Sequence, residues 1–403
     1  MNLRRFSTLL GISVLMVPAA ANAAVHKVFP GESIQAAIDV ASPGDTILVE
    51  PGVYTENAAS RYGLRITTDN LRLIGKKKGP GEGGKVRLIA NGAQETGIYA
   101  APAGCEYDQP EGSCAAPDLQ GFYVRGFSVE EYPKNGIQTR WVDGFEFVRN
   151  ASVNNLNNGI YPTLSANGLV RNNSSYGSLD TAMWVAGSEN VRVIGNELFG
   201  SVIGFEITVS NDVHVTQNEI YDNTVGVGLF HPNGAGNPPL PVMANWLIEH
   251  NDIYDNNRPN EAPPGTFQSI LPQGVGVLLL GVSDHVVAKN SVEDNDFVGI
   301  GLLGWCTATN GTPENCGANP PIWPTDASNN LVELNYLSGN GLNPQAGPLN
   351  FLAADATYFD LGDGSSGNCF TKNKPKNGFT FVSSEPDGEL PTDGCKTRGP
   401  KKK

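Results

Sequence analysis

Three side chains that suit sugar chemistry recur along the sequence at nearly constant spacing. Tyr161, Trp184 and Glu206 are 23 and 22 residues apart, and His231 follows 25 residues later. In a coiled repeat, this spacing places the aromatic pair beside the carboxylate, with about 5 Å between neighbouring coils. Aromatic rings cover the apolar faces of pyranoses, while an acid contacts their hydroxyl groups. The pattern therefore predicts a face that binds a glycan.

Glu206 and His231 are the candidate acid and base of this face, because both residue types transfer protons readily. Removal of the C5 proton of a uronate also needs a cation beside the sugar carboxylate. Arg140 is the candidate for that role, although it lies three coils, roughly 14 Å, from Glu206. Gln138 and Phe230 occupy further outward positions and complete the predicted substrate-binding set.

Each of these residues also has a structural interpretation. Trp184 suits packing under a long loop, Glu206 suits an ordinary surface carboxylate, and His231 suits an anchor before Pro232. Catalysis requires Glu206 and His231 to reach one substrate, whereas binding does not. The sequence leaves this choice open.

A repeat of 22 or 23 residues positions these side chains. Each unit holds short alternating segments separated by one- or two-residue turns, which is typical of a solenoid of strands. An asparagine recurs at Asn150, Asn172 or Asn173, Asn196, Asn218, Asn251, Asn290 and Asn335, and a small residue at Gly136, Gly159, Ala182, Gly204, Gly226, Gly276 and Gly299. We expect the asparagines to form an inward hydrogen-bonded ladder rather than glycosylation sites. The small residues indicate either positive φ or a crowded backbone.

The stretch "FPGESIQAAIDVASPGDTILVEPGVYTEN" (Phe29–Asn57) resembles the opening of right-handed parallel β-helix proteins of the pectin-lyase-like superfamily. The resemblance extends to about Asn340 and implies an all-β solenoid whose first coil is capped by a short helix at Ser33–Ala41. Such a cap is expected because the open end would expose unpaired strand edges. The superfamily contains lyases, hydrolases, esterases, epimerases and proteins without a known reaction. The motifs "DPHD", "RxPxxR" and "DFIFG" of some of its enzymes are missing here, as are the paired aspartates of polygalacturonases.

The remaining sequence indicates an exported protein. Residues 1–23 read as a signal peptide, residues 24–345 as the β-helix, and residues 346–403 as an irregular coil, a cap and a basic tail. The apolar part of the signal is too short to span a bilayer, so we expect no membrane span. A formal net charge of −14 argues against nucleic acid and anionic membranes as partners. We expect a monomer that is secreted or periplasmic.

Cysteine spacing supports export and argues against a metal centre. Six cysteines fall into close pairs that we expect to be disulfides: Cys105 with Cys114, Cys306 with Cys316 and Cys369 with Cys395. The acidic stretches Glu293–Asp296 and Asp360–Gly364 are candidates for Ca²⁺, although neither matches an EF-hand loop. Scarce Met and Cys and the lack of a His cluster disfavour a metal-insertion accessory protein.

Two classes of function follow. The first is an exported β-helix that engages a polysaccharide or oligosaccharide, with uronate chains as a candidate, in a lateral groove and acts as a lyase or C5-epimerase. The second is a non-catalytic glycan-binding or surface-structural module.

Overall fold

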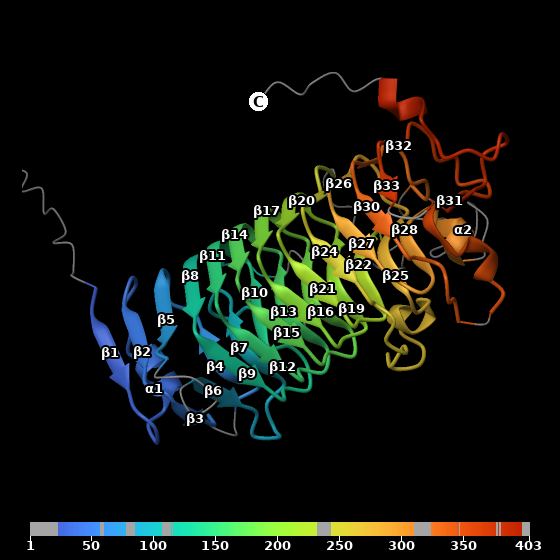
Figure 1. Ribbon diagram of the computed structural model, residues 1–403. Helices are drawn as coiled ribbons and strands as arrows, with labels where there is room; N and C mark the ends of the chain where they lie inside the picture. The colour runs from blue at the N-terminus through green and yellow to red at the C-terminus, as the bar shows by residue number, and fades with distance from the viewer. Residues whose placement is uncertain are drawn as a thin grey trace, which may run out of the picture.

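The computed structural model describes residues 23–56, 60–77, 85–106, 114, 116–231, 243–309, 324–345, 347–375, 378 and 380–396. The chain forms a right-handed parallel β-helix, as the sequence predicts. Its coils follow one another along a single axis, from β1 and α1 at the N-terminal end to β31 and α2 at the other (Figure 1). The predicted signal peptide, apart from Ala23, and the basic tail from residue 397 lie outside the described residues.

Three parallel sheets, here called A, B and C, run the length of the described chain. Sheet A contains β1 (Val25–Val28), β2 (Thr46–Val49), β5 (Leu71–Gly75), β8 (Leu119–Arg125), β11 (Val142–Val148), β14 (Ala166–Arg171), β17 (Glu189–Ile194), β20 (Asn211–Thr216), β23 (Leu247–Glu249), β26 (Val286–Ala288), β29 (Leu331–Glu333) and β32 (Cys369–Thr371). Sheet B contains β3 (Gly52–Tyr54), β6 (Val86–Ile89), β9 (Phe127–Glu130), β12 (Ala151–Val153), β15 (Ser174–Tyr176), β18 (Glu197–Phe199), β21 (Glu219–Tyr221), β24 (Asp252–Tyr254), β27 (Ser291–Glu293), β30 (Tyr336–Ser338) and β33 (Lys374–Pro375). Sheet C contains β4 (Tyr62–Ile66), β7 (Thr96–Ala100), β10 (Ile137–Arg140), β13 (Asn158–Thr163), β16 (Thr181–Ala186), β19 (Ile203–Thr208), β22 (Val225–Phe230), β25 (Val275–Leu280), β28 (Val298–Leu303), β31 (Ala354–Phe359) and β34 (Phe381–Ser383).

The asparagine repeat forms a buried ladder at the corner between sheets A and B. The backbone N–H and side-chain amide of Asn196 both donate to Asn218 Oδ1, at 2.8 and 2.9 Å, and Asn218 repeats this pattern on Asn251. The ladder continues through Asn290, Asn335 and Asn373. Each rung satisfies turn groups that would otherwise be buried without partners. The predicted ladder is therefore confirmed, with Asn173 as the member at its coil.

The other two corners carry ladders of their own that the sequence analysis did not identify. Between sheets B and C the ladder runs from Ser178 and Ser201 through Asn223, Asn256, Asn295 and Asn340 to Asp355. Between sheets C and A, the hydroxyl groups of Ser165, Ser188 and Ser210 accept backbone N–H groups of the preceding coil. Every corner is thus held by side chains in register.

Crowding, not positive φ, explains the repeated glycine. A Cβ at Gly226 would lie 2.6 Å from the carbonyl oxygen of Gly276 on the next coil, and one at Gly159 would lie 2.4 Å from that of Ala182. Neither residue has a left-handed backbone. The coils therefore pack closely at this position, where each coil of the predicted repeat carries glycine except for the buried Ala182.

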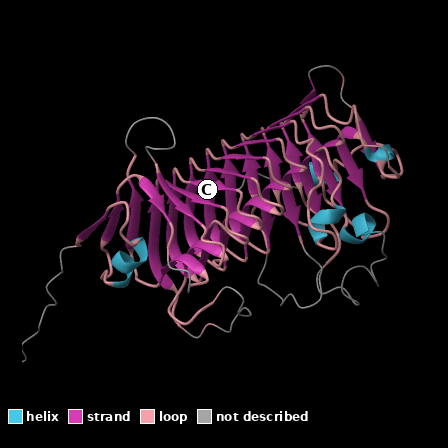
Figure 2. Ribbon diagram, turned by 90° about the horizontal axis from the view of Figure 1, so that it is seen from below, coloured by secondary structure: helices cyan, strands magenta, loops and turns pink. Residues whose placement is uncertain are grey.

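One short helix lies at the N-terminal end of the described solenoid, and the other short helices lie in its C-terminal half (Figure 2). At the N-terminal end, α1 (Ile34–Asp39) begins at Ser33, whose hydroxyl accepts the N–H of Ala36, and Ile34 and Ile38 enter the core. In the C-terminal half, η2 (Phe267–Ile270) and α2 (Trp305–Thr309) lie beside sheet C, η3 (Asn350–Leu352) precedes β31, and η4 (Asp393–Lys396) packs against β32. The strands β31 to β34 extend all three sheets beyond residue 345, where the sequence analysis placed the end of the β-helix.

Cysteine pairing follows the predicted scheme where it is described. Cys105 bonds to Cys114 and Cys369 to Cys395. Cys306 is also in a disulfide, whereas its predicted partner, Cys316, lies outside the described residues. In the described part of the chain, no helix is long and apolar enough to cross a bilayer.

Candidate functional site

The predicted outward row lies on sheet C, in register from coil to coil. Gln138 pairs with Tyr161, and Trp184 pairs with Glu206. The rings of Tyr161 and Trp184 stack with their centroids 4.6 Å apart and their planes 12° apart, and both are half-buried. The predicted aromatic pair beside a carboxylate is therefore present.

Glu206 is buried rather than exposed, which corrects the expected solvent-facing position. Only 3% of its surface is accessible, and its Oε2 lies 2.7 Å from the hydroxyl of Thr181 on the preceding coil. Burial, followed by the charge of neighbouring Asp180, raises the pKa of the Glu206 carboxyl well above its usual range. A carboxyl with a raised pKa keeps its proton to a higher pH than an exposed glutamate does, which suits a proton-donating role.

Asp180 is a candidate site residue that sequence reasoning missed. The Thr181 hydroxyl lies 3.1 Å from Asp180 Oδ1 as well as 2.7 Å from Glu206 Oε2. One hydroxyl has one proton, so it can donate to only one carboxylate, and it accepts from the other if that group is protonated. Burial raises the pKa of Asp180 to about 6. Two acids that share one hydroxyl therefore form a proton-holding pair.

The signal for Asp180 was weak because the residue lies in the turn before its strand. The stretch "SLDT" (Ser178–Thr181) places it directly before Thr181, the first residue of β16. The alternation rule covers only positions within the strand. The signal in the sequence was an acidic turn residue directly before Thr181, whose hydroxyl can hydrogen-bond to carboxylates on both sides.

Next to this pair, the segment 256–273 covers the outer face of sheet C. The ring of Phe267 packs edge-on against Phe230 at 5.3 Å and stacks on Trp305 at 5.6 Å. The side chain of Gln268 lies near Asp180 and lowers the pKa of its carboxyl in part. Phe230 is consequently 1% exposed, which corrects its predicted role as an exposed sugar contact. It instead supports one wall of the groove.

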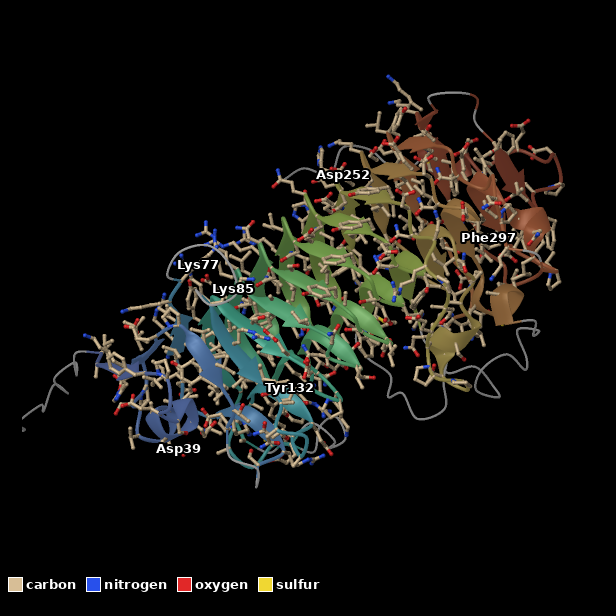
Figure 3. The ribbon with its side chains drawn as sticks, turned by 60° about the horizontal axis from the view of Figure 1, so that its bottom comes forward. Asp39, Lys77, Lys85, Tyr132, Asp252 and Phe297 are labelled. Carbon is tan, nitrogen blue, oxygen red and sulfur yellow. A yellow bond between two sulfur atoms is a disulfide. The ribbon has the colours of Figure 1, made fainter. Side chains whose placement is uncertain are left out.

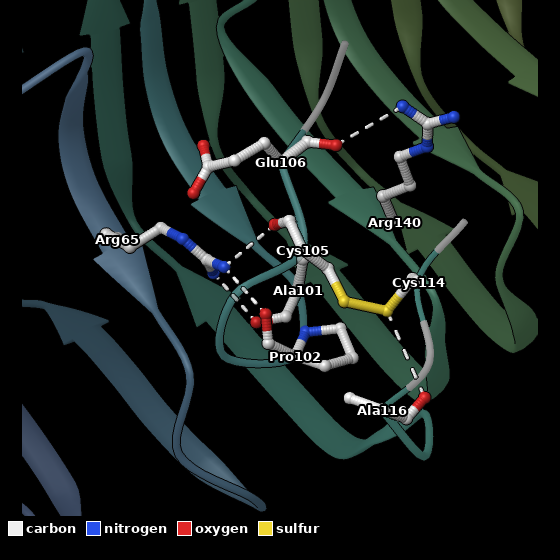
Figure 4. The surroundings of a disulfide bond; sticks show 8 residues. All are labelled: Arg65, Ala101, Pro102, Cys105, Glu106, Cys114, Ala116 and Arg140. Atoms are coloured by element: carbon white, nitrogen blue, oxygen red, sulfur yellow. Dashed lines mark hydrogen bonds between the residues drawn. A yellow bond between two sulfur atoms is a disulfide. The ribbon is translucent and has the colours of Figure 1, made fainter. Parts of the chain in front are cut away.

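The opposite end of the groove lies at the Cys105–Cys114 disulfide, which Figure 4 shows. The Arg65 guanidinium donates to the backbone carbonyls of Ala101, Pro102 and Cys105 and so holds the loop against sheet C. The outer surface of sheet C between the two loops, with the half-buried Tyr161, Asp180 and Trp184 and the buried Glu206, is here called the sheet C groove.

Two further predicted site residues lie in structural positions. Arg140 is 8% exposed, packs over the ring of Trp141 at 4.3 Å, and donates to the Glu106 carbonyl (Figure 4). Gln138 is 2% exposed and accepts from the amide of Asn135. Both side chains therefore support the groove from beneath rather than project into it.

His231 and Glu206 engage different neighbours. His231 lies three residues beyond Gly228, the register partner of Glu206, and its Nδ1 is 3.2 Å from the Gly281 carbonyl oxygen. Burial lowers the pKa of His231 to about 4, so the ring is neutral at pH 7. Glu206, in contrast, faces Thr181 and Asp180. The geometry favours Asp180 over His231 as the group that works with Glu206.

The described residues do not fit a metal centre. They contain no group of three or more His, Cys, Asp or Glu side chains arranged to hold an ion. In the candidate calcium stretch at residues 360–364, the Asp360 carboxylate accepts the N–H groups of Gly362, Asp363 and Ser365, and Asp363 accepts those of Cys306 and Thr307. These carboxylates are therefore occupied by loop backbone.

Comparisons with known proteins agree with the fold. Three solved structures share the parallel β-helix with this chain. The A-modules of the mannuronan C-5 epimerases AlgE4 and AlgE6 from Azotobacter vinelandii superpose with TM-scores of 0.52 and 0.53, at 16% and 17% identity, over 85% and 87% of this chain and 94% and 93% of theirs. The DFA-IIIase of Arthrobacter chlorophenolicus A6 bound to DFA-III has a TM-score of 0.55 at 15% identity, over 92% of this chain and 86% of its own. At these identities, the likeness concerns the fold alone.

Residues 103–263 match the family model described as periplasmic copper-binding protein (NosD). The match covers less than half of the chain, so it shows similarity in the central coils. Copper prefers thiolate, thioether and imidazole ligands. Among the described residues the cysteines are disulfide-bonded and no candidate ion-binding group occurs, so the residues present do not fit a copper site. No curated protein matches the chain.

Proposed function

We propose that the protein binds a polysaccharide along the sheet C groove and that the Asp180–Glu206 pair carries out acid–base chemistry on it. The observation that supports this most directly is the Thr181 hydroxyl shared by the two carboxylates. Most enzymes that cleave glycosidic bonds use two carboxyl groups whose pKa values differ. Trp184 lies on the same strand as Thr181 and stacks on Tyr161 of the preceding coil, so the pair offers an apolar contact for a sugar ring beside the two acids.

In this proposal, Glu206 donates a proton to the glycosidic oxygen as the bond to the anomeric carbon breaks. Asp180, which is half-buried and ionises more readily, acts as nucleophile or as base toward water. Thr181 orients both carboxylates. Tyr161 and Trp184 hold the sugar ring in place.

A neutral glycan suits this groove better than a uronate chain. Lyase and epimerase reactions need a cation beside the sugar carboxylate. Arg140, the predicted cation, is buried over Trp141, and the pair itself would repel a second negative charge. Uronate lyase and C5-epimerase activity therefore rank below hydrolysis or transfer of a neutral chain.

The test incubates the purified protein with neutral and uronate polysaccharides and follows new reducing ends, unsaturated products and binding in parallel. We expect reducing ends from a neutral chain, lost in D180N and E206Q and weakened in W184A. The matched control is E189Q, which removes an exposed carboxylate on sheet A. Unsaturated products would contradict the hydrolytic assignment and favour a lyase. Binding without any product would leave the protein as a glycan-binding module, for which the near-complete burial of Glu206 is the supporting observation.

Export is part of the proposal. Disulfides persist in oxidising compartments, and two are described in full here. We therefore expect the protein in the periplasm or the medium, which fractionation of expressing cells checks.

A further inference from the structure

A basic groove lies at the corner between sheets A and B, in the N-terminal part of the solenoid. It has a volume of about 810 Å³, and Lys76, Lys77, Lys85, Arg125 and Arg149 line it. Lys77 and Lys85 lie near each other on this side of the molecule in Figure 3. One acid, Glu197, also lines the groove, and its carboxylate is already bound by the hydroxyl of Tyr221.

The arginines of this corner lack the partners that cations have elsewhere in the chain. Arg61 and Lys134 share Glu95, Arg258 pairs with Glu261, and Lys289 pairs with Glu249. Arg125, Arg149 and Arg171 are exposed, and no carboxylate among the described residues pairs with them. In a chain with a net charge of −14, three neighbouring unpaired guanidinium groups are a local reversal of charge.

The three arginines lie on three successive coils. Val148 is in register with Arg125 on one side and with Arg171 on the other, and Arg149 directly follows Val148. Arg149 has φ 55°, in the turn before the ladder residue Asn150, so its side chain leaves the corner rather than the sheet. Three successive coils therefore each carry one arginine at this corner, with about 4.8 Å between neighbouring coils; Arg125 and Arg149 line the groove, and Arg171 directly precedes the lining residue Asn172.

Two glycines line the groove at the turn position of Arg149. That position is Gly126 in the preceding coil and Gly195 two coils later. The positive φ of Gly126, 78°, is one that glycine adopts without strain. Neither glycine carries a side chain that would obstruct a chain lying along the corner.

We propose that this corner groove binds an acidic polysaccharide that carries one carboxylate or sulfate per sugar, laid parallel to the solenoid axis. A linked pyranose advances by about the distance between coils, so successive anionic groups meet successive arginines. A nucleic-acid strand carries a charge every 3.4 Å or so and does not keep this register. Guanidinium groups bind carboxylate and sulfate oxygens in paired hydrogen bonds. The site is separate from the sheet C groove and does not depend on its chemistry.

The test measures affinity for oligogalacturonates of defined length and for the same chains after reduction of their carboxyl groups. The triple variant R125Q/R149Q/R171Q is compared with R72Q/R192Q/K289Q, which removes three positive charges elsewhere on the surface. We expect the first variant to bind at least about tenfold more weakly and the second to resemble the unmodified protein. We also expect binding by the unmodified protein to weaken as salt rises.

Several outcomes would overturn the proposal. These are no binding by the unmodified protein at low salt, equal loss in the two triple variants, and equal binding of the reduced, neutral chains. Tighter binding of single-stranded DNA with the same number of charges, or of vesicles rich in anionic lipid, would assign the corner to another partner. D180N and W184A, which alter the sheet C groove, should leave the affinity of the corner groove unchanged. The proposal for the corner groove and the proposal for the sheet C groove can therefore be rejected independently. Thermal unfolding of each variant confirms that it is folded.

Discussion

At the scale of single residues, the two carboxylates joined through Thr181 make the protein sensitive to alkaline conditions. Glu206 and Asp180 have folded-state pKa values above their ordinary ones, so the folded protein holds protons that the unfolded chain releases. Their contribution to stability is fully present below the ordinary carboxyl range and is lost as pH rises through the raised values. We expect E206Q to lose less free energy of unfolding than the unmodified protein between acidic and alkaline pH, as measured by urea unfolding. If the free energy of unfolding of E206Q and that of the unmodified protein changed with pH in parallel, the raised pKa of the buried pair would be contradicted.

The same pair should set the pH dependence of catalysis. Activity requires Asp180 ionised and Glu206 protonated, so we expect it to rise with pH through about 6 and to fall again at the higher pKa of the pair. Initial rates on the neutral glycan identified by the panel test this. A rate that keeps rising through alkaline pH would rule out Glu206 as the acid.

Buried histidines have the opposite effect on stability. Burial lowers the pKa of His285 to about 3, and the ring stacks on Trp246 with 4.0 Å between centroids. Because the unfolded histidine binds a proton below its ordinary pKa of 6.5, the stability that the neutral ring contributes is present above that pH and is lost as pH falls. The loss approaches about 1.4 kcal/mol per pH unit for each such residue. We expect H285N to show a shallower loss between pH 6.5 and 4, while H250N, at an exposed position, keeps the original slope.

At the scale of elements, the ladders predict where the solenoid is weakest to mutation. Asn218 accepts two hydrogen bonds from Asn196 and donates to Val193, Thr216 and Asn251. N218A would leave several buried groups without partners, at a cost of about 2–4 kcal/mol. N373A removes the last rung and should cost less, because that residue receives bonds from Asn335 and passes none to a further asparagine. Hydrogen exchange should show the loss of protection in N218A centred on β20 to β23; uniform loss along the chain would contradict local coupling between coils.

Backbone crowding makes a second prediction for the elements of sheet C. In G226A the new methyl group would lie 2.6 Å from the Gly276 carbonyl oxygen and 2.8 Å from the Asn256 amide nitrogen, so β22 and β25 must separate. We expect a lower unfolding midpoint. G347A is the matched control, because the nearest atom to its Cβ would be 3.8 Å away. Equal midpoints for the two variants would refute the crowding explanation.

At the scale of the whole molecule, the N-terminal cap is expected to keep the protein monomeric. The helix α1 buries Ile34 and Ile38 over the first coil, where strand edges would otherwise be open. I34D/I38D should expose that end and produce higher-order assemblies in size-exclusion chromatography. The matched change E32K/D39K alters exposed positions of the same segment and should stay monomeric. Assemblies in both variants would show that charge, not capping, controls association.

The periodic features of this molecule were predictable from the sequence, and the irregular ones were not. The Asn150–Asn335 ladder, the crowded glycines and the Tyr161–Trp184–Glu206 row all followed from one spacing, because register copies each position from coil to coil. Asp180 was not identified as a site residue because it lies in a turn, where the alternation of inward and outward side chains along a strand does not apply. The packing of Phe267 over Phe230 could not be predicted, because the segment 256–273 has no counterpart in other coils. The raised pKa of Glu206 reflects its burial and the charge of Asp180, so it could not be inferred from the repeat alone.

The three ladders have a consequence for how this protein can diversify. Where neighbouring coils carry the same rungs, as along the asparagine ladder between sheets A and B, duplication or deletion of one coil would join like rungs. Because the sheet C groove lies between two loops attached to particular coils, such an event would change the length of the glycan that we propose it binds in steps of about one sugar. Ligand length would then change by whole coils, while the contacts within each remaining coil stay as they are.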